Sequence, residues 1–210
     1  MHKTVDFFFD LGSPASYLAW TQLPGLCARQ GATLHYRPML LGGVFQATGN
    51  ASPAMVPAKG RYMFTDLARF AARYGVPFGL PPGFPVNTLA LMRGVMGTQL
   101  RSPERLEVLL SVLFNGLWVQ RRNLSDSGVL DETLSQAGFD PQVFHALAAD
   151  PEVKAALKQA TEVAVERGVF GAPTCFVGEA MFFGQDRLDF VEEALSQGAS
   201  SFSSECVPTG

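Results

Sequence analysis

The stretch "DFFFDLGSPASYLAW", residues 6–20, joins an apolar run to a helical pattern through a serine and a proline. Residues 4–9 are rich in β-forming side chains and are predicted to form a strand. From residue 14 to about residue 29 the apolar side chains recur at helical spacing, and Gly31 is the predicted helix end. A second alternating stretch, "TLHYRP" at residues 33–38, completes a strand–helix–strand unit whose short joints favour a parallel crossover.

The middle of the chain follows a different pattern. Residues 42–58 are rich in Gly, Ala, Pro and Ser and are predicted to be a loop. From residue 59 to residue 167 the chain is predicted to be almost entirely helical, with helix-start signals such as Asp140-Pro141. The expected helices cover residues 60–74, 87–99, 103–120, 126–137, 141–148 and 151–167, and the proline-rich residues 74–85 are expected to form a loop.

Strand patterns return after Gly168. The runs "TCFVG" (174–178) and "AMFFG" (180–184) are typical of a hairpin, and residues 186–195 are predicted to form a closing helix. This order predicts an α/β protein with a thioredoxin-like fold (βαβ–ββα) that is split by a large all-helical insertion. We therefore expect a discontinuous α/β domain made of residues 1–42 and 168–197. Residues 45–167 are expected to form a helical insertion domain, and residues 198–210 a mobile tail.

The composition excludes several classes of function. The chain has 210 residues, of which 17% are charged, and its net charge of -3 gives no reason to expect a nucleic acid or an anionic membrane as partner. No apolar run reaches the roughly 18 residues that a membrane helix needs. Cys27, Cys175 and Cys206 form no C-x-x-C pair, so no metal site or dithiol redox motif is expected. Because the N-terminus has no signal-peptide pattern, the expected location is the cytoplasm.

Two short motifs occupy the places where a thioredoxin-type fold builds its reactive site. Ser13 lies where the first strand meets the first helix, and Pro173 in "GAPT" lies just before a later strand, where such folds carry a cis-proline. Each motif also has an ordinary interpretation, since Ser-Pro is a good helix start and proline often ends a loop. Their occurrence together in one outline favours a shared site.

Serine at this place indicates a hydrogen-bond donor. Ser13 cannot form a disulfide, and the contexts of His2, His35 and His145 offer it no general base, so a nucleophilic serine is not expected. A helix N-terminus provides free N–H groups and partial positive charge, which stabilise an external thiolate together with the hydroxyl. Such surroundings lower a thiol pKa from about 8.5 to roughly 3.5–7.5, which makes the thiolate abundant at neutral pH.

Motifs along residues 4–196 resemble those of the 2-hydroxychromene-2-carboxylate isomerases, which are DsbA-like relatives of the kappa-class glutathione transferases. The motifs are "DFFFDLGSPASYLAW", "GGVFQATGN", "PAKGRYM", "GVFGAPTCFVG" and "FFGQDRLDFV". The resemblance implies a glutathione-dependent cis/trans isomerase that forms trans-o-hydroxybenzylidenepyruvate from 2-hydroxychromene-2-carboxylate, or acts on a similar aromatic-degradation intermediate. It implies reversible thiolate addition, with glutathione as a regenerated cofactor, and a homodimer.

The resemblance also assigns site residues. It places the catalytic serine on Ser13 and a lysine of the related transferases on Lys59. Lys59 and Arg61 could bind substrate carboxylates, and Asn87, at a predicted helix start, is a further candidate for a substrate contact. The glutathione contacts that the resemblance implies are Ser13, Pro14, Asn50, Ala172, Pro173, Gln185 and Asp186. One departure is Gln46, which stands where many relatives carry a lysine.

Several alternatives stay open. The same glutathione site could serve a kappa-like transferase or peroxidase, or a glutathione-binding module without turnover. For single residues the alternatives are strand packing at Ala172 and helix capping at Asp186 and Asn87. Cys175 is expected to be an inert buried thiol, and the aromatic side chains of Phe84 and Trp118 are expected in the core.

Overall fold

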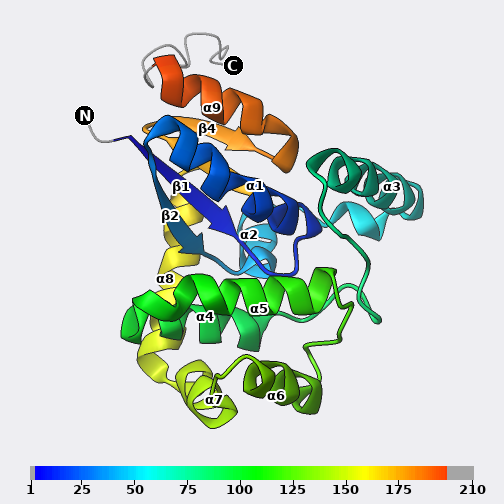
Figure 1. The fold of residues 1–210 in the computed structure, drawn as a ribbon, viewed down its shortest axis with the longest axis vertical. Helices are drawn as coiled ribbons and strands as arrows, with labels where there is room; N and C mark the ends of the chain where they lie inside the picture. Colours follow the sequence, from blue (N-terminus) through cyan, green and yellow to red (C-terminus); the bar gives the residue numbers. More distant parts are fainter. Residues whose placement is uncertain (1–2, 198–210) are drawn as a thin grey trace.

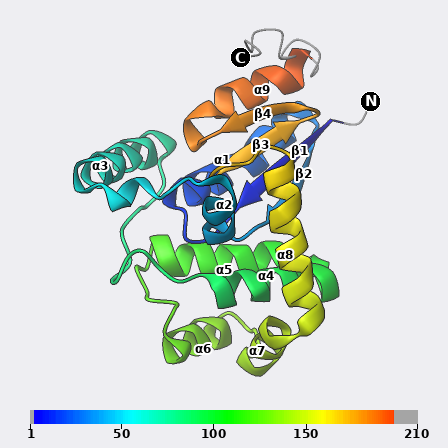
Figure 2. The same cartoon turned by 180° about the vertical axis from the view of Figure 1, so that it is seen from behind.

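A computed structural model describes residues 3–197 and contains one four-stranded sheet with helices on both of its faces (Figures 1 and 2). The strand order is β2-β1-β3-β4, with β1 parallel to β2 and antiparallel to β3. The strands are β1 (Thr4–Phe9), β2 (Thr33–Pro38), β3 (Thr174–Val177) and β4 (Ala180–Phe183). The predicted βαβ and ββα units are therefore confirmed, and the predicted tail at residues 198–210 lies outside the described residues.

The helical segments between β2 and β3 match most of the predicted ones, with shifts of a few residues at their ends. The α-helices are α1 (Pro14–Gln30), α2 (Leu41–Thr48), α3 (Pro57–Tyr74), α4 (Leu89–Arg101), α5 (Leu106–Trp118), α6 (Ser127–Gln136), α7 (Pro141–Ala149), α8 (Pro151–Glu166) and α9 (Leu188–Gln197). Short 3-10 turns are η1 (Pro53–Met55), η2 (Pro103–Arg105) and η3 (Gln185–Arg187). No described residue from 59 to 167 is in a strand, as predicted.

Three consecutive phenylalanines in β1 are buried on both faces of the sheet. Phe7 and Phe9 point into the larger core, against α1 and α5, and their rings stack with centroids 5.2 Å apart. Phe8 points to the opposite face, into a smaller core with Val44 of α2 and Ala164 of α8. The sequence of β1 is therefore continuously apolar because helices cover both faces of the sheet, as is usual where a strand has a parallel neighbour.

The larger core continues from the sheet into the helical block. Trp118 at the end of α5 is fully buried, as predicted, and its Nε1 donates to the carbonyl of Leu11 at 2.9 Å. Phe114 packs against Trp20 of α1 with ring centroids 5.2 Å apart. One cluster of buried side chains thus spans the proposed boundary between the α/β part and the insertion, and it holds the turn after β1 in place.

The prediction of a loop over residues 42–58 is wrong, because α2 forms there. Gly42 and Gly43 lower the intrinsic helix propensity of this stretch, which hid the helix in the sequence. Tertiary packing overrides that propensity: α2 buries Val44 in the smaller core beside α8. A Cβ on Gly43 would lie only 3.1 Å from Thr161 Cγ2, so glycine allows the two helices to approach closely.

Asp6 ties the sheet to the end of α8. Its carboxylate accepts from Arg37 Nε at 2.9 Å and from Arg167 Nη1 at 2.8 Å. Burial would raise the pKa of Asp6, but the two guanidinium groups outweigh it and hold the pKa below its usual value. Arg167 also lies over the ring of Phe176, 3.9 Å from its centroid, so it is held from two sides.

We expect Asp6→Asn to reduce the dependence of the free energy of unfolding on pH in the acid range. A depressed carboxyl pKa contributes stability that is present above the unfolded value of about 3.9 and is lost as the pH falls through the folded value. The free energy of unfolding, measured by urea titration between pH 2 and pH 7, should therefore fall less steeply below about pH 4 in the variant. Equal slopes in the two proteins would contradict the assigned role of this ion pair.

Among the described residues, no helix is both long enough and apolar enough to span a membrane.

Candidate active site

The turn between β1 and α1 leaves one backbone donor free at the helix start. Ser13 is the N-cap, with extended backbone (φ -90, ψ 113), and its Oγ accepts from Ser16 N at 3.1 Å. Its carbonyl accepts from Tyr17 N at 3.2 Å, and Pro14 has no N–H to donate. Within residues 3–197 no acceptor faces the N–H of Ala15, which lines the adjacent cavity. This N–H and the Ser13 hydroxyl are therefore the donors offered to a ligand.

Ser13 directly faces the residue before Pro173. Its Oγ donates to the carbonyl of Ala172 at 2.9 Å, and the Ala172–Pro173 peptide is cis, as predicted. The N–H of Ala172 meets no acceptor in the described part of the chain. The two motifs that the sequence singled out thus lie together, although they are 159 positions apart.

Asp10 holds the β1–α1 turn in place through hydrogen bonds, a role that the sequence did not predict. Its Oδ1 accepts from Gly12 N at 2.8 Å and from Thr88 Oγ1 at 2.7 Å, and its Oδ2 accepts from Leu41 N at 2.8 Å. Burial raises the pKa of Asp10, while these three hydrogen bonds oppose the rise. One carboxylate therefore joins the Ser13 turn to the starts of α2 and α4. The available signal was an acid closing an apolar strand three residues before the serine.

A cavity of about 860 Å³ opens beside Ser13. Its walls come from the β1–α1 turn, α2, α3, the segment before β3 and η3. Seven of the predicted site residues line it: Ser13, Pro14, Asn50, Lys59, Ala172, Gln185 and Asp186. The structure therefore brings together residues from five separate parts of the sequence.

The polar groups of the cavity are held in different ways. Asn50 Nδ2 donates to the carbonyl of Phe170 at 2.8 Å, so this side chain positions the segment before β3. The Gln185 carbonyl accepts from Tyr74 Oη at 2.8 Å. Asp186 lies in η3 and pairs with Arg187 at 2.7 Å, and it is not the cap of α9, which begins at residue 188. Lys59 is exposed and forms no ion pair with the described residues.

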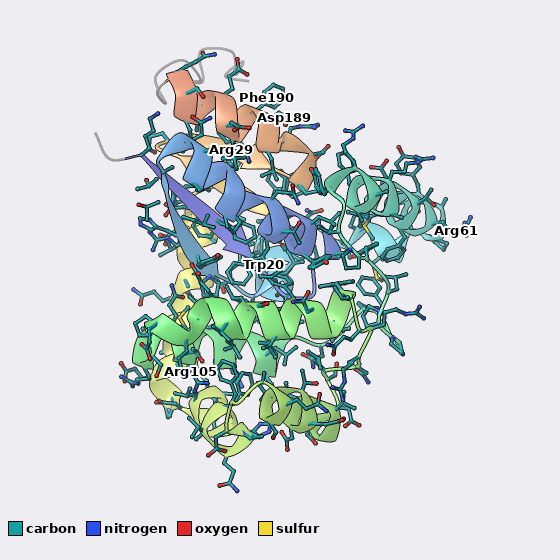
Figure 3. The ribbon with its side chains drawn as sticks, viewed as in Figure 1. Trp20, Arg29, Arg61, Arg105, Asp189 and Phe190 are labelled. Atoms are coloured by element: carbon teal, nitrogen blue, oxygen red, sulfur yellow. The ribbon has the colours of Figure 1, made fainter. Side chains whose placement is uncertain are left out.

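Two of the predicted substrate contacts lie outside the lining of this cavity. Arg61 is exposed on α3 and points outward, away from the sheet (Figure 3). Asn87 lies just before Thr88, the N-cap of α4, and its Oδ1 accepts from Leu89 N at 3.1 Å. Phe84, which was expected in the core, packs its ring on Phe64 with centroids 5.2 Å apart and also lines the cavity. Gln46 lines a different cavity, on the other side of α2.

Comparison with known proteins identifies the family. Residues 4–196 match the model of the DSBA-like thioredoxin domain. The chain belongs to this family. Within it, a 2-hydroxychromene-2-carboxylate isomerase from Sphingobium xenophagum is 35% identical over 198 residues, which cover 93% of this chain and 99% of the relative.

Two further relatives agree with the resemblance seen in the motifs. A solved structure of a 2-hydroxychromene-2-carboxylate isomerase has a TM-score of 0.83 at 30% identity and covers 96% of this chain and 100% of its own. Glutathione S-transferase kappa 1 from Homo sapiens is 29% identical over 207 residues, covering 93% and 92% of the two chains. This DSBA-like chain is thus a member of the 2-hydroxychromene-2-carboxylate isomerase family, with kappa-class transferases close to it.

The two cysteines in the described part of this DSBA-like chain lie outside the lining of the site. Cys27 and Cys175 are buried free thiols. Burial raises the pKa of Cys27 to about 11 and also raises that of Cys175, so neither is a thiolate at neutral pH. The prediction of an inert thiol at Cys175 is confirmed. Cys206 lies outside the described residues.

Proposed function

We propose that this chain is a glutathione-dependent cis/trans isomerase that acts on 2-hydroxychromene-2-carboxylate or a similar aromatic-degradation intermediate. The observation that carries the proposal is the meeting of the Ser13 hydroxyl with the Ala172–Pro173 turn at one cavity, in a chain of an isomerase family. A homodimer is part of the proposal and rests on the resemblance alone, and a cytoplasmic location stays a prediction from the sequence.

The polar groups of the cavity suit glutathione. The Ala172 N–H and carbonyl can pair with the cysteinyl unit in the manner of an added strand. Asp186 can accept from the γ-glutamyl ammonium. Ser13 and Ala15 then face the place where the cysteinyl sulfur would lie. The ammonium, the cysteinyl backbone and the thiolate of glutathione therefore each have a matching group in the lining.

The Ser13 hydroxyl has a single proton to donate, so it can donate either to the Ala172 carbonyl or to a bound thiolate. In the structure the hydroxyl donates to Ala172, and it can rotate to donate to a thiolate while Oγ still accepts from Ser16 N. Together with the free Ala15 N–H and the positive end of α1, this donor favours the ionised form of a bound thiol. When bound, glutathione supplies a thiolate that adds reversibly to a conjugated double bond, which allows rotation about that bond.

The remaining walls suit an aromatic acid. Apolar and aromatic side chains line the cavity beyond Ser13: Leu41, Phe45, Tyr62, Met63, Leu67 and Phe84. Lys59 is the one cationic side chain among the residues that line it in the described structure. A flat apolar ring with one carboxylate would therefore find both an apolar wall and a positive charge.

The balance of glutathione tests the proposal. With glutathione well below the substrate concentration, an isomerase completes many turnovers and leaves the total thiol unchanged. Product analysis by chromatography with thiol titration should show both. Consumption of one glutathione per product would instead support a kappa-like transferase, which the human relative makes the second candidate. Tight glutathione binding without turnover on any conjugated enone would support a binding module.

We expect Asp186→Asn to weaken glutathione binding by up to about fivefold, because an exposed ion pair contributes at most about 1 kcal/mol. Isothermal titration calorimetry with glutathione measures the change. Asp189→Asn is the matched control, since Asp189 lies on α9, outside the residues that line the cavity, and is exposed (Figure 3). Equal affinity in both variants would remove Asp186 from the proposed site.

A further inference from the structure

A second cavity, of about 650 Å³, lies on the other side of α2 from Ser13. Leu41 and Phe45 of α2 line the Ser13 cavity, whereas Gly43 and Ala47 line the second one. Its other walls come from α4 and α8, which contact each other, and α2 also contacts α8. The function proposed above makes no use of this cavity.

Arg93 is the unusual group in its wall. Most arginines in the described chain pair with an acid, a carbonyl or an aromatic ring, as Arg101 does with Asp150. Arg93 is half-buried on α4, and no such partner faces it within residues 3–197. A partly desolvated guanidinium without a partner is unfavourable unless an anion can reach it.

The charges along α8 give the cavity a positive end. Lys154 has no ion pair among the described residues, whereas Lys158 is paired with Glu162 at 3.6 Å. Glu166 lies twelve positions after Lys154, which corresponds to about 18 Å along a helix. The two acids that line the cavity, Glu162 and Glu166, therefore lie toward the far end of α8, while Asp150 and Glu152 at the near end are paired with Arg101. An anion in the cavity would find Lys154 free at that near end.

The floor of the cavity between these charges is apolar, and its polar side chain already has hydrogen-bond partners. Leu40, Leu89, Leu157 and Val165 line it. Thr161 is the polar group of the floor, and its Oγ1 accepts from Leu40 N at 3.0 Å and donates to the Leu157 carbonyl at 2.8 Å. The volume lies within the roughly 300–1,000 Å³ that small-molecule sites occupy.

We propose that this cavity is a second ligand site, which binds a small apolar carboxylate. The carboxylate lies at Arg93 and Lys154, and the apolar body covers Leu157 beside Gly43. Arginine suits this role because its planar donors match a carboxylate in a bidentate manner. The site is separate from the glutathione site and does not depend on the proposed reaction.

Calorimetric titration of the full chain with 2-naphthoate tests this site. We expect Arg93→Gln to weaken binding by about tenfold or more, as for loss of a hydrogen bond to a charged group. Ala47→Phe should abolish the same binding event by filling the cavity while every charge stays in place. Arg73→Gln, which removes an arginine of α3 outside the residues that line either cavity, should leave it unchanged. Circular dichroism would verify that each variant is folded.

Three outcomes would overturn the proposal. The first is wild-type affinity for 2-naphthoate in both Arg93→Gln and Ala47→Phe. The second is equal competition by acetate, which would show that the apolar floor contributes nothing. The third is a pair of results: the wild type does not bind 2-naphthoate, and light scattering shows that Arg93→Gln no longer forms a dimer. That pair would make the cavity an interface between two copies of the chain. Because Lys59→Gln changes only the Ser13 cavity, it should not alter this binding event.

Discussion

Ser13→Ala is expected to lower turnover about ten- to a hundredfold while the chain stays folded. A hydrogen bond to a charged group contributes about 1.5–3 kcal/mol, whereas a lost helix cap costs about 1 kcal/mol of stability. In the proposed complex the Ser13 hydroxyl makes both contributions, because it turns from the Ala172 carbonyl to the thiolate and still caps α1. The pKa of bound glutathione should rise in the variant, seen as weaker thiolate absorbance near neutral pH.

The control for this prediction is Ser16→Ala, one helical turn along α1 from Ser13. Ser16 is buried, and its Oγ has no hydrogen-bond partner in the described structure. Ser16→Ala therefore removes a hydroxyl from the same helix without removing a hydrogen bond, and it should leave turnover and the thiolate titration unchanged. If Ser13→Ala behaves like Ser16→Ala, then Ser13 is only a cap.

Asp10→Ala is expected to cause the largest loss of stability, about 2–6 kcal/mol. The change leaves the partly buried N–H groups of Gly12 and Leu41 without their acceptor, and a buried unsatisfied group costs about 1–3 kcal/mol. Urea denaturation measures the loss. Asp10→Asn keeps one acceptor oxygen and should fall between the alanine variant and the wild type. A loss below about 1 kcal/mol in Asp10→Ala would contradict the assigned role of this carboxyl.

The pH dependence of Asp10 has the opposite sign to that of Asp6. Burial raises its folded pKa above the unfolded value of about 3.9, so its contribution is fully present below that value. The contribution is lost as the pH rises through the folded pKa. Stability of the wild type should therefore decline over that interval relative to Asp10→Asn, in urea titrations at stepped pH. No such decline would indicate that Asp10 is ionised with an ordinary pKa.

Local patterns predicted the parts of the site that depend on neighbouring residues. The run of phenylalanines indicated β1, the Ser-Pro pair indicated the start of α1, and "GAPT" indicated the turn before β3. Each of these signals is complete within about ten residues. The glutathione contacts were predicted from the resemblance, and six of those seven residues, all except Pro173, line one cavity in the structure.

The features that were missed depend on distant partners. Helix α2 contains two glycines and forms because it packs against α8, which no local pattern shows. The role of Asp10 needs Leu41 and Thr88, which are 31 and 78 positions away. Arg61 and Asn87 were predicted to contact the substrate, but the direction of a side chain on α3 and the hydrogen bond of Asn87 at the start of α4 are set by the tertiary fold.

A crystal structure of this protein with glutathione tests the central claim most directly. We predict the cysteinyl sulfur within hydrogen-bonding distance of Ser13 Oγ and of the Ala15 N–H, with the cysteinyl backbone paired to Ala172. We also predict that Ser13 no longer donates to the Ala172 carbonyl as it does at 2.9 Å here. A sulfur that lies away from Ser13, or glutathione bound outside this cavity, would contradict the account.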